Sequence, residues 1–315
     1  MKAVQFARYG EPDVLQIQEV PDPVPGPDDV LINVKATTVN RLDLFQRAGS
    51  RPVAQLPFTP GLEAAGVVLY DAHGFHTGER VLTTRAPLAK GGGGYAGKLA
   101  VPASHLARIP DNVSFEQAVA AGLAASTAWG SLFDLGHLKS GERVLIWAGS
   151  SGVGSAGVQL AKHAGAWVAT TASSEERATV LRGLGADLVV NHRRQDVAKT
   201  LQEQGGANLV IELVSTTLQV SLDACAPDGR VVLIGNLGGQ QATVDTQSWR
   251  LKRVTVIGGG MLRSAVADEQ KILQLITEKA FRPLIARTLP IAQAAEAHRL
   301  LASGEIQGKI VLIHE

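Results

Sequence analysis

The chain of 315 residues has a single cysteine, Cys225. One cysteine cannot form a disulfide within the chain or a zinc site built from several thiolates, and it suits a reducing, cytoplasmic setting. An excess of charge is also missing, because 30 Lys and Arg residues face 29 Asp and Glu residues, for a net charge of +1. This balance gives no electrostatic basis for binding nucleic acid or a membrane surface.

Long apolar runs are absent as well. Residues 1–8 lack the apolar centre of a signal peptide. Residues 117–133 are uncharged but rich in Ala, Gly, Ser and Thr, and residues 144–161 are interrupted by a Gly-Ser-Ser-Gly turn. Neither is a continuous apolar run of about 20 residues, so no transmembrane helix is predicted. The chain has no internal repeat, and its only low-complexity run is residues 91–94.

The composition that is present predicts a folded chain of about two domains, since 45% of the residues are hydrophobic and 19% are charged. In residues 1–115, Pro and Gly clusters bound short apolar runs such as 30–34 and 80–83. Proline bounds strands rather than occupying them, so this region is predicted to be a β-rich, barrel-like domain.

From residue 116 the pattern changes to α/β. Apolar runs alternate with helical stretches, and the strands are predicted at residues 144–148, 167–171, 188–190, 209–211, 231–234 and 254–257. Continuously apolar strands separated by helices indicate a doubly wound parallel sheet, the Rossmann class of fold. The last strand, at 309–313, has no helix after it and is predicted to return to the first domain. The expected domains are therefore 1–115 plus 286–315, and 116–285.

The strongest single motif is Ser151-Gly152-Val153-Gly154-Ser155-Ala156-Gly157, which contains G-x-G-x-x-G. It follows an apolar strand and opens a helix, which is the context of the dinucleotide-binding fingerprint. There the glycines permit a tight turn and close approach of a pyrophosphate, and the helix N-terminus offers its N–H groups. The alternative is a glycine turn that binds nothing.

The second strand of this domain ends without the Asp or Glu that an NAD site places there to bind the ribose. Ser173 and Ser174 can donate to a 2′-phosphate instead, and Arg177 and the His192-Arg193-Arg194 segment add positive charge. The competing interpretation is that Ser173-x-x-Glu176 is only a capping box. The missing acid favours NADPH over NADH.

Five further motifs occur in a specific order. They are Asn40-x-x-Asp43-x-x-x-Arg47-x-Gly49, Gly61-Leu62-Glu63-Ala64-Ala65-Gly66-Val67-Val68, Gly78-Glu79-Arg80-Val81, Gly94-Tyr95-Ala96 and Gly308-Lys309-Ile310-Val311. With the nucleotide motif they resemble the medium-chain dehydrogenase/reductase superfamily, and within it the zinc-free quinone oxidoreductases, over nearly the whole chain. The resemblance implies a GroES-like catalytic domain with an inserted Rossmann domain, an active site in the cleft, and a homodimer joined through an edge strand, for which 254–257 is the candidate.

Zinc-dependent members of the superfamily bind their metal through Cys and His. The matching positions here are Asn40, Leu62 and the segment 122–125, none of which is Cys or His. The H-x-x-H pair His73 and His76 is interpreted as a surface turn, so no metal site is predicted. Without a Lewis acid the substrate must itself be electrophilic, as quinones and conjugated enones or enals are.

The resemblance also implies site residues. Asn40, Arg41, Leu42 and Asp43 are expected to border the cleft, with Arg41 and Leu42 near the coenzyme, and Thr127 to contact the nicotinamide. Ser151, Gly152, Val153 and Gly154 are expected to hold the pyrophosphate, and Ser173, Ser174, Arg177 and His192 to surround the 2′-phosphate. The loops Gly235-Asn236-Leu237 and Gly259-Gly260-Met261 are expected to flank the nicotinamide, with Lys309 nearby. The catalytic candidates are Asn40, Asp43, Arg51 and Tyr95.

Two of these positions depart from the family pattern. Relatives often carry Tyr where this chain has His192, and a Tyr proton donor where it has Arg51. A guanidinium can bind an oxyanion but is a very poor acid, which disfavours an enoyl thioester reductase and favours quinones, whose reduced anion water can protonate. Tyr95, beside the glycine run, is either a substitute proton donor or a wall of the loop.

Structural alternatives remain open for several candidates. Asn40 can be a turn residue, Asp43 a helix-terminal charge that pairs with Arg47, Thr127 a hydroxyl bonded to its own helix, and Cys225 a thiol buried in a helix. The leading hypothesis is an NADPH-dependent reductase of quinones or related conjugated carbonyls. An enal or enone double-bond reductase is the second, and a non-catalytic NADPH-binding protein that senses redox state or binds RNA is the third, although the near-zero net charge disfavours RNA binding.

Overall fold

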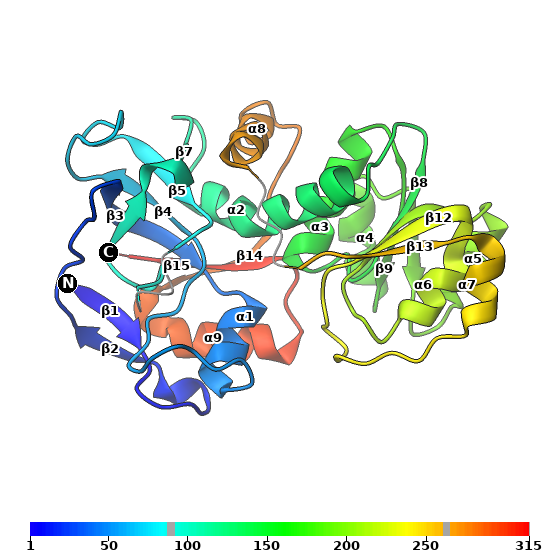
Figure 1. Ribbon diagram of the computed structural model, residues 1–315, viewed down its shortest axis with the longest axis horizontal. Coiled ribbons are helices and arrows are strands. Elements are labelled where there is room, and N and C mark those ends of the chain that lie inside the picture. The colour runs from blue at the N-terminus through cyan, green and yellow to red at the C-terminus, as the bar shows by residue number, and fades with distance from the viewer. Residues whose placement is uncertain (87–91, 261–264, 315) are drawn as a thin grey trace. The chain divides into compact units, whose positions relative to one another are not determined.

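The computed structural model of the chain describes residues 1–86, 92–260 and 265–314 (Figure 1). Its contacts divide the chain into two compact units. Unit 1 is Met1–Leu123 with Ala265–Glu315, and unit 2 is Ala124–Ser264. The boundaries expected from the sequence were 115/116 and 285/286. The second differs most because helix α8 (Val266–Thr277) packs on strand β7 (Ala107–Arg108) of unit 1, where the Gln270 side chain bonds both the N–H and the carbonyl of Arg108.

Unit 1 is built on a mixed sheet with the strand order β14-β15-β3-β4-β5-β7, and β6 also pairs with β3. The strand β15, near the C-terminal end of the chain, pairs antiparallel with β3 of the same unit, with Val311 opposite Thr38. The strands are β1 (Lys2–Gln5), β2 (Gln16–Glu19), β3 (Asp29–Thr38), β4 (Ala64–Val68), β5 (Arg80–Thr83), β6 (Lys98–Pro102), β14 (Ile285–Pro290) and β15 (Lys309–Ile313).

The helices of unit 1 cover this sheet. One apolar core joins β1, α1, α9 and β15 through the side chains Val4, Leu44, Ala297 and Ile310, respectively. The helices are η1 (Pro12–Val14), α1 (Arg41–Ala48), η3 (Ala103–His105), α8, η5 (Ile291–Gln293) and α9 (Ala294–Ser303).

Unit 2 contains the predicted parallel sheet, with the strand order β10-β9-β8-β11-β12-β13. Numbered from the first strand of the unit, this is the order 3-2-1-4-5-6 of the doubly wound Rossmann fold. All five strand pairs are parallel, so the carboxyl ends of the strands lie along one edge of the sheet. The strands are β8 (Arg143–Ile146), β9 (Trp167–Ala172), β10 (Leu188–Asn191), β11 (Ala207–Glu212), β12 (Cys225–Leu233) and β13 (Thr255–Gly258).

Helices of unit 2 pack on this sheet, which is why its strands are almost continuously apolar. Helices α3 and α4 pack on β8 to β10, whereas α5, α6 and α7 pack on one another and on β10 to β12. Buried side chains such as Leu145, Val190 and Val210 form the core. The helices are α3 (Gly152–His163), α4 (Glu175–Gly183), α5 (Val197–Glu203), α6 (Leu218–Ala224) and α7 (Thr246–Lys252).

Helix α2 (Phe115–Trp129) is continuous with a π-helical turn, η4 (Gly130–Leu135). Among the described residues, this 21-residue segment is long and apolar enough to span a membrane by length and composition. Of its most apolar window, 67% is buried inside the structure. A core helix passes the same test, so the apolar face of this segment is accounted for by packing.

Candidate functional site

The turn between β8 and α3 in unit 2 has the geometry expected of a pyrophosphate cradle. Ser151 is the N-cap of α3, and its Oγ accepts a hydrogen bond from the Gly154 N–H at 3.0 Å. A Cβ on Gly154 would lie only 2.8 Å from the carbonyl carbon of Ala148, so the turn closes this tightly only with glycine there. Because the first N–H groups of a helix have no partner within it, such a turn presents donors to an anion.

The carboxyl ends of β9 and β10 lie side by side because the two strands pair in register, with Asn191 opposite Ala172. Ser173 therefore follows one strand and His192 the next. The His192 N–H donates to the Ala172 carbonyl oxygen at 3.2 Å, which joins the two strand ends directly. The topology thus brings together residues that are 19 positions apart in the sequence.

The cap of α4 differs from the sequence-based interpretation. Ser174, not Ser173, is the N-cap, since its backbone is extended (φ −151°, ψ 163°) and its Oγ accepts from the Arg177 N–H at 3.3 Å. Ser173 lies outside the cap. The carboxylate of Glu175 pairs with Arg182 at 2.6 Å, so the repulsion that this acid would exert on a phosphate is compensated by a neighbouring cation.

Positive charge gathers at this strand edge. Desolvation, and then the guanidinium groups of Arg193 and Arg177, lower the pKa of His192. Two arginines are therefore near enough to the imidazole to disfavour a further positive charge. An anion bound there would reverse this effect, because an opposite charge favours the charged form of the imidazole.

The other loops predicted for the coenzyme follow strands of the same sheet. Gly235-Asn236-Leu237 comes after β12 and Gly259-Gly260 after β13, and the Gly259 N–H donates to the Leu233 carbonyl oxygen at 2.9 Å. Met261 lies outside the described residues. Thr127 is half-buried on α2, and its carbonyl oxygen accepts from Ser131 Oγ at 2.6 Å. Unit 2 thus carries the side chains and backbone groups that fit a dinucleotide.

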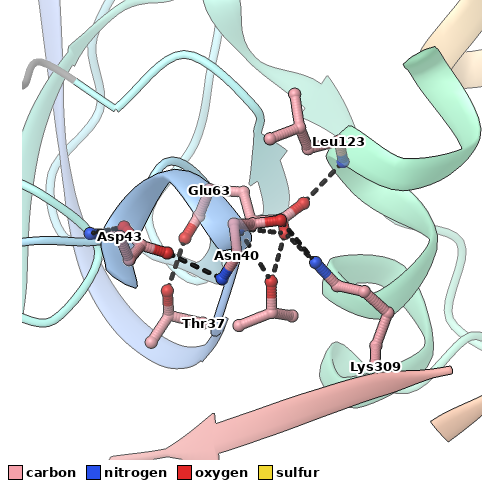
Figure 2. Close-up of polar contacts among 8 residues, drawn as sticks. Thr37, Asn40, Asp43, Glu63, Leu123 and Lys309 are labelled. Carbon is pink, nitrogen blue, oxygen red and sulfur yellow. Dashed lines mark hydrogen bonds and ion pairs between the residues drawn. The ribbon is translucent and has the colours of Figure 1, made fainter. Parts of the chain in front are cut away.

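Unit 1 contains a buried polar cluster made of Thr38, Asn40, Glu63 and Lys309. Figure 2 shows the last three of these residues with the contacts between them. We call it the Glu63 cluster. The carboxylate of Glu63 has no exposed surface and accepts from Asn40 Nδ2 (3.2 Å), Lys309 Nζ (3.1 Å) and Thr38 Oγ1. Its other oxygen accepts from the backbone N–H of Leu123 on α2 at 2.5 Å.

Lys309 joins the cluster from β15. Its Nζ donates to Asn40 Oδ1 at 2.7 Å as well as to Glu63, and the residue is 6% exposed. Asn40, expected at the border of the cleft, and Lys309, expected near the nicotinamide, are thus in direct contact across 269 positions of sequence. Glu63 itself is absent from the sequence-based candidates. The available signal was a lone acid in the otherwise apolar run from Leu62 to Val68.

Arg41 and Leu42, the other two residues expected beside Asn40, form the first turn of α1. Arg41 is exposed at the start of the helix. Leu42 is half-buried.

Asp43 lies beside this cluster but uses both carboxylate oxygens on backbone groups. Oδ2 accepts from the Asn40 N–H at 2.7 Å and Oδ1 from the Gly61 N–H at 3.0 Å. Burial raises the pKa of Asp43 to about 6. The i+4 pair with Arg47 does not form, because Arg47 donates instead to the Gly10 carbonyl oxygen at 2.7 Å. These contacts favour a structural role for Asp43.

Tyr95 is not a flexible loop residue, because it is fully buried, with its ring against Gly61 and its hydroxyl 3.1 Å from His298 Nε2. Burial, and then the nearby carboxylates of Asp43 and Glu63, raise the pKa of Tyr95 well above its ordinary value. A weaker acid is a poorer proton donor. Arg51 is exposed, and its backbone N–H donates to the Phe45 carbonyl oxygen at 3.2 Å.

The positions that match zinc ligands in zinc-dependent relatives do not fit a zinc ion. Asn40 Oδ1 accepts a hydrogen bond from an ammonium group, Leu62 has no ligand atom, and segment 122–125 contains only Gly, Leu and Ala. The neighbouring acid, Glu63, already accepts hydrogen bonds with both carboxylate oxygens. In residues 1–86, 92–260 and 265–314, no group of three or more His, Cys, Asp or Glu side chains could hold a metal. His76 contacts Asp71 in an exposed turn.

Cys225 is buried, as expected, but it is the first residue of β12 and not part of a helix. Burial raises the pKa of its thiol to about 12, which makes it unreactive as a nucleophile.

Two family models match the chain. The model described as "Alcohol dehydrogenase GroES-like domain" covers residues 26–111, and the one described as "Zinc-binding dehydrogenase" covers residues 152–278. The first covers strands β3 to β7 of unit 1, and the second covers unit 2 from α3 to β13 together with α8 of unit 1.

Curated relatives and solved structures match over almost the whole length. The chain is 32% identical to a quinone oxidoreductase of Pongo abelii (99% of this chain, 98% of the relative) and 31% identical to a 2-haloacrylate reductase of a Burkholderia species (99% and 98%). It superposes on Escherichia coli quinone oxidoreductase complexed with NADPH with a TM-score of 0.90 at 27% identity, covering 99% of this chain and all of the other. The chain therefore belongs to the medium-chain dehydrogenase/reductase superfamily, in its quinone oxidoreductase family.

Proposed function

We propose that this protein is an NADPH-dependent reductase that transfers a hydride to quinones or related conjugated carbonyl compounds without a metal ion. The observation that carries the proposal is the end of β9, where Ser173, Arg177 and His192 gather and the ribose-binding acid of NAD sites is missing. The relatives named quinone oxidoreductase, one of them solved with NADPH, support the same coenzyme and the same reaction class.

Each part of unit 2 has a task in this proposal. Ser151, Gly152, Val153 and Gly154 would bind the pyrophosphate through backbone N–H groups and the cap hydroxyl. Ser173 would donate to the 2′-phosphate, and the Arg177 and His192 side chains would compensate its charge. The loops after β12 and β13, with Thr127, would border the nicotinamide. A bound NADPH supplies the hydride, and the chain's own contribution is to orient the coenzyme and exclude water.

The acceptor class follows from the donor set of unit 1. The residues aligned with zinc ligands cannot supply a Lewis acid, so an unactivated ketone or alcohol would be a poor substrate. A quinone or a conjugated enone delocalises the electron pair that it gains, and needs less help. Asn40 and Lys309 are the side chains that we assign to the acceptor end. The contacts of Asp43 and Tyr95 give them structural tasks, and the exposed Arg51 is the weakest catalytic candidate.

A second candidate acceptor is an activated alkene. The 31% identical 2-haloacrylate reductase supports this alternative, since its substrate carries a carbon–carbon double bond beside a carboxylate. Such an acceptor would use the same coenzyme and the same cluster. The difference lies in the position of the electrophilic atom, and only turnover distinguishes the two.

Location and assembly are proposals of the same kind. We expect a cytoplasmic protein, because of its single buried thiol. We also expect a homodimer joined through β13, which is the last strand of the unit 2 sheet and pairs with β12 on one side. An unpaired strand edge is a ready surface for pairing with a second copy.

The test is a panel of acceptors measured with NADPH and with NADH. A simple quinone, an alkenal, 2-chloroacrylate and an enoyl thioester would be compared by kcat/KM. We expect the highest value with a quinone and NADPH, and at least about tenfold less with NADH, for loss of charge-assisted contacts to one phosphate. Best activity on the thioester, or equal use of both coenzymes, would refute the proposal.

A further inference from the structure

The starting point is the way in which the Glu63 cluster uses its hydrogen-bond donors. An ammonium group has three N–H donors. Lys309 gives one to Asn40 Oδ1 and one to Glu63 Oε1. In the described part of the chain the structure gives no acceptor for the third, although the Lys309 side chain is only 7% exposed. A buried cation with an unused donor is arranged to receive another oxygen atom.

A buried ion pair between Glu63 and Lys309 also has a high desolvation free energy for a contact with a purely structural role. Removing two charges from water costs several kcal/mol per ion, and an apolar pair of similar size often stabilises a protein equally well or better. In the same unit, the apolar residues Val4, Phe6 and Ile310 form a core without any charge. Stability alone therefore does not account for an ion pair between Glu63 and Lys309.

The cluster is held firmly against α2. Glu63 Oε2 accepts from the Leu123 N–H, and a Cβ on Gly122 would lie 2.5 Å from the same oxygen. Glycine at 122 thus permits the carboxylate to approach the helix backbone. One helical turn further along α2 is Thr127, the residue assigned above to the nicotinamide.

We propose that Lys309 is the group that stabilises the negative charge formed on the acceptor when the hydride is transferred, and that Glu63 is the positioning residue that fixes the Lys309 ammonium and the Asn40 amide for this task. Figure 2 shows the arrangement, with Glu63 between Asn40, Lys309 and the N–H of Leu123. This inference rests on the proposed function. It adds that Lys309 stabilises the negative charge on the acceptor, as a Lewis acid does in metal-dependent enzymes.

The chemistry balances without a further reagent. The acceptor would gain a hydride from bound NADPH, which would leave as NADP⁺, and the electron pair of the broken C=O or C=C π bond would remain as a negative charge on oxygen. The third N–H of Lys309 donates a hydrogen bond to that oxygen, and the proton that completes the product comes from water. Lys309 stays protonated throughout, so it acts by charge and hydrogen bonding and not as an acid.

The first test compares variants at saturating NADPH. Lys309→Met should lower the single-turnover rate of hydride transfer by about 100-fold, the usual loss for one oxyanion donor. Glu63→Gln, which keeps the shape but removes the charge, should lower it by about 10-fold, and Lys309→Arg should keep more activity than Lys309→Met, because it retains a donor. In all three, the Kd for NADPH should change by less than about threefold, since the lost contact is to the acceptor.

Glu269→Gln is the matched control. Glu269 is also buried in unit 1, at 1% exposure, and also pairs with a cation, Arg85, at 3.1 Å. We expect it to lower thermal stability about as much as Glu63→Gln, with a rate within about twofold of the original chain. An equal rate loss in Glu269→Gln would make the effect one of stability. A raised Kd for NADPH with unchanged hydride transfer in Lys309→Met would assign the lysine to the coenzyme, and either result overturns the inference.

A second readout is independent of turnover. The probe is 4-nitrophenol, whose yellow phenolate mimics the oxyanion of a reduced quinone. In the NADP⁺-loaded protein at pH 6, bound probe should be at least about tenfold more ionised than free probe, because a fixed cation favours the phenolate. Lys309→Met should abolish this effect. If the original chain reduces no acceptor but still ionises the probe, the proposed function fails while the role of Lys309 stands. If it reduces quinones but ionises the probe no more than Lys309→Met does, the role of Lys309 fails alone.

Discussion

In unit 2 the candidate nucleotide contacts come directly after strands of a single parallel sheet, at Ser151, Ser173, His192, Gly235 and Gly259. In unit 1 the polar side chains of the Glu63 cluster come from residues 38–40, 63 and 309, on three strands and the turns beside them. The first arrangement depends on backbone groups and glycines whose local sequence is recognisable. The second depends on side chains that meet only after the chain has folded. Nucleotide binding and charge stabilisation should therefore respond separately to mutation.

The largest predicted effect is on the pH dependence of the free energy of unfolding. It concerns Tyr95 and His298, a second pair in unit 1 that is distant in sequence. Burial, and then Arg47, lower the pKa of His298 to about 3, from 6.5. Between these values the unfolded chain binds a proton that the folded chain does not, so the free energy of unfolding falls as the pH decreases, by about 3 kcal/mol at pH 4.5. His298→Gln should lack this loss. The raised pKa of Asp43 acts in the opposite direction, but it is common to both proteins and cancels in the difference.

The measurement is urea unfolding of the original chain and of His298→Gln at pH 7 and pH 4.5. The stability gap between the two proteins should narrow or reverse at the lower pH. Parallel loss of stability in both would show that His298 is not the group that titrates.

The next largest effect is expected for Gly154→Ala, which tests whether the glycine turn of unit 2 binds the coenzyme. The new Cβ would meet the backbone of Ala148, so the turn must open and NADPH binding should weaken by about 100-fold. The control is Gly183→Ala at the end of α4, where a Cβ would meet nothing within 4 Å. Binding is read from the fluorescence of NADPH on titration. Equal affinity in the two variants would mean that the turn does not hold the coenzyme.

A smaller effect is expected from Arg177→Ala. Removal of a cation beside the 2′-phosphate should lower the NADPH/NADH ratio of kcat/KM by about 10-fold, since the 2′-phosphate is the only difference between the coenzymes. Arg250→Ala, an exposed arginine on α7 of the same unit, should leave the ratio unchanged. A decrease with both coenzymes alike would indicate a general structural effect.

The smallest predicted effect, Gly122→Ala, is also the most specific to unit 1. The added methyl group would press on Glu63 Oε2 and weaken its bond to the Leu123 N–H. Alanine favours a helix over glycine by about 1 kcal/mol, so α2 should not unfold. We expect hydride transfer to slow by about 5-fold to 10-fold, as a partial form of the loss expected at an oxyanion donor, with NADPH affinity unchanged. If Gly122→Ala lowered the rate of hydride transfer and the affinity for NADPH together, nucleotide binding and charge stabilisation would not be separable functions of the two units.

The sequence predicted much of this molecule because the decisive features are local. The strand at 309–313 was predicted with its observed ends, and the strand–helix alternation of unit 2 required only continuous apolar runs bounded by turns. The glycine motif predicted the tight turn that begins α3, because glycine is the residue that permits such a close approach of the backbone. The cap of α4 was misplaced by one residue because Ser173 and Ser174 are chemically equal, and only backbone angles distinguish them.

The remaining features depended on contacts that no local pattern contains. Glu63 and Lys309 are 246 positions apart, and Tyr95 and His298 are 203 apart. Local propensity and periodicity describe neighbours within a turn of helix or a step of strand, whereas an ion pair depends on where two strands lie in the finished sheet. The sequence by itself determined the fold class and the tight glycine turn between β8 and α3 that we assign to the pyrophosphate. The tertiary structure decided which buried charges meet, because burial and partners, not residue type, determine what a charged side chain can do.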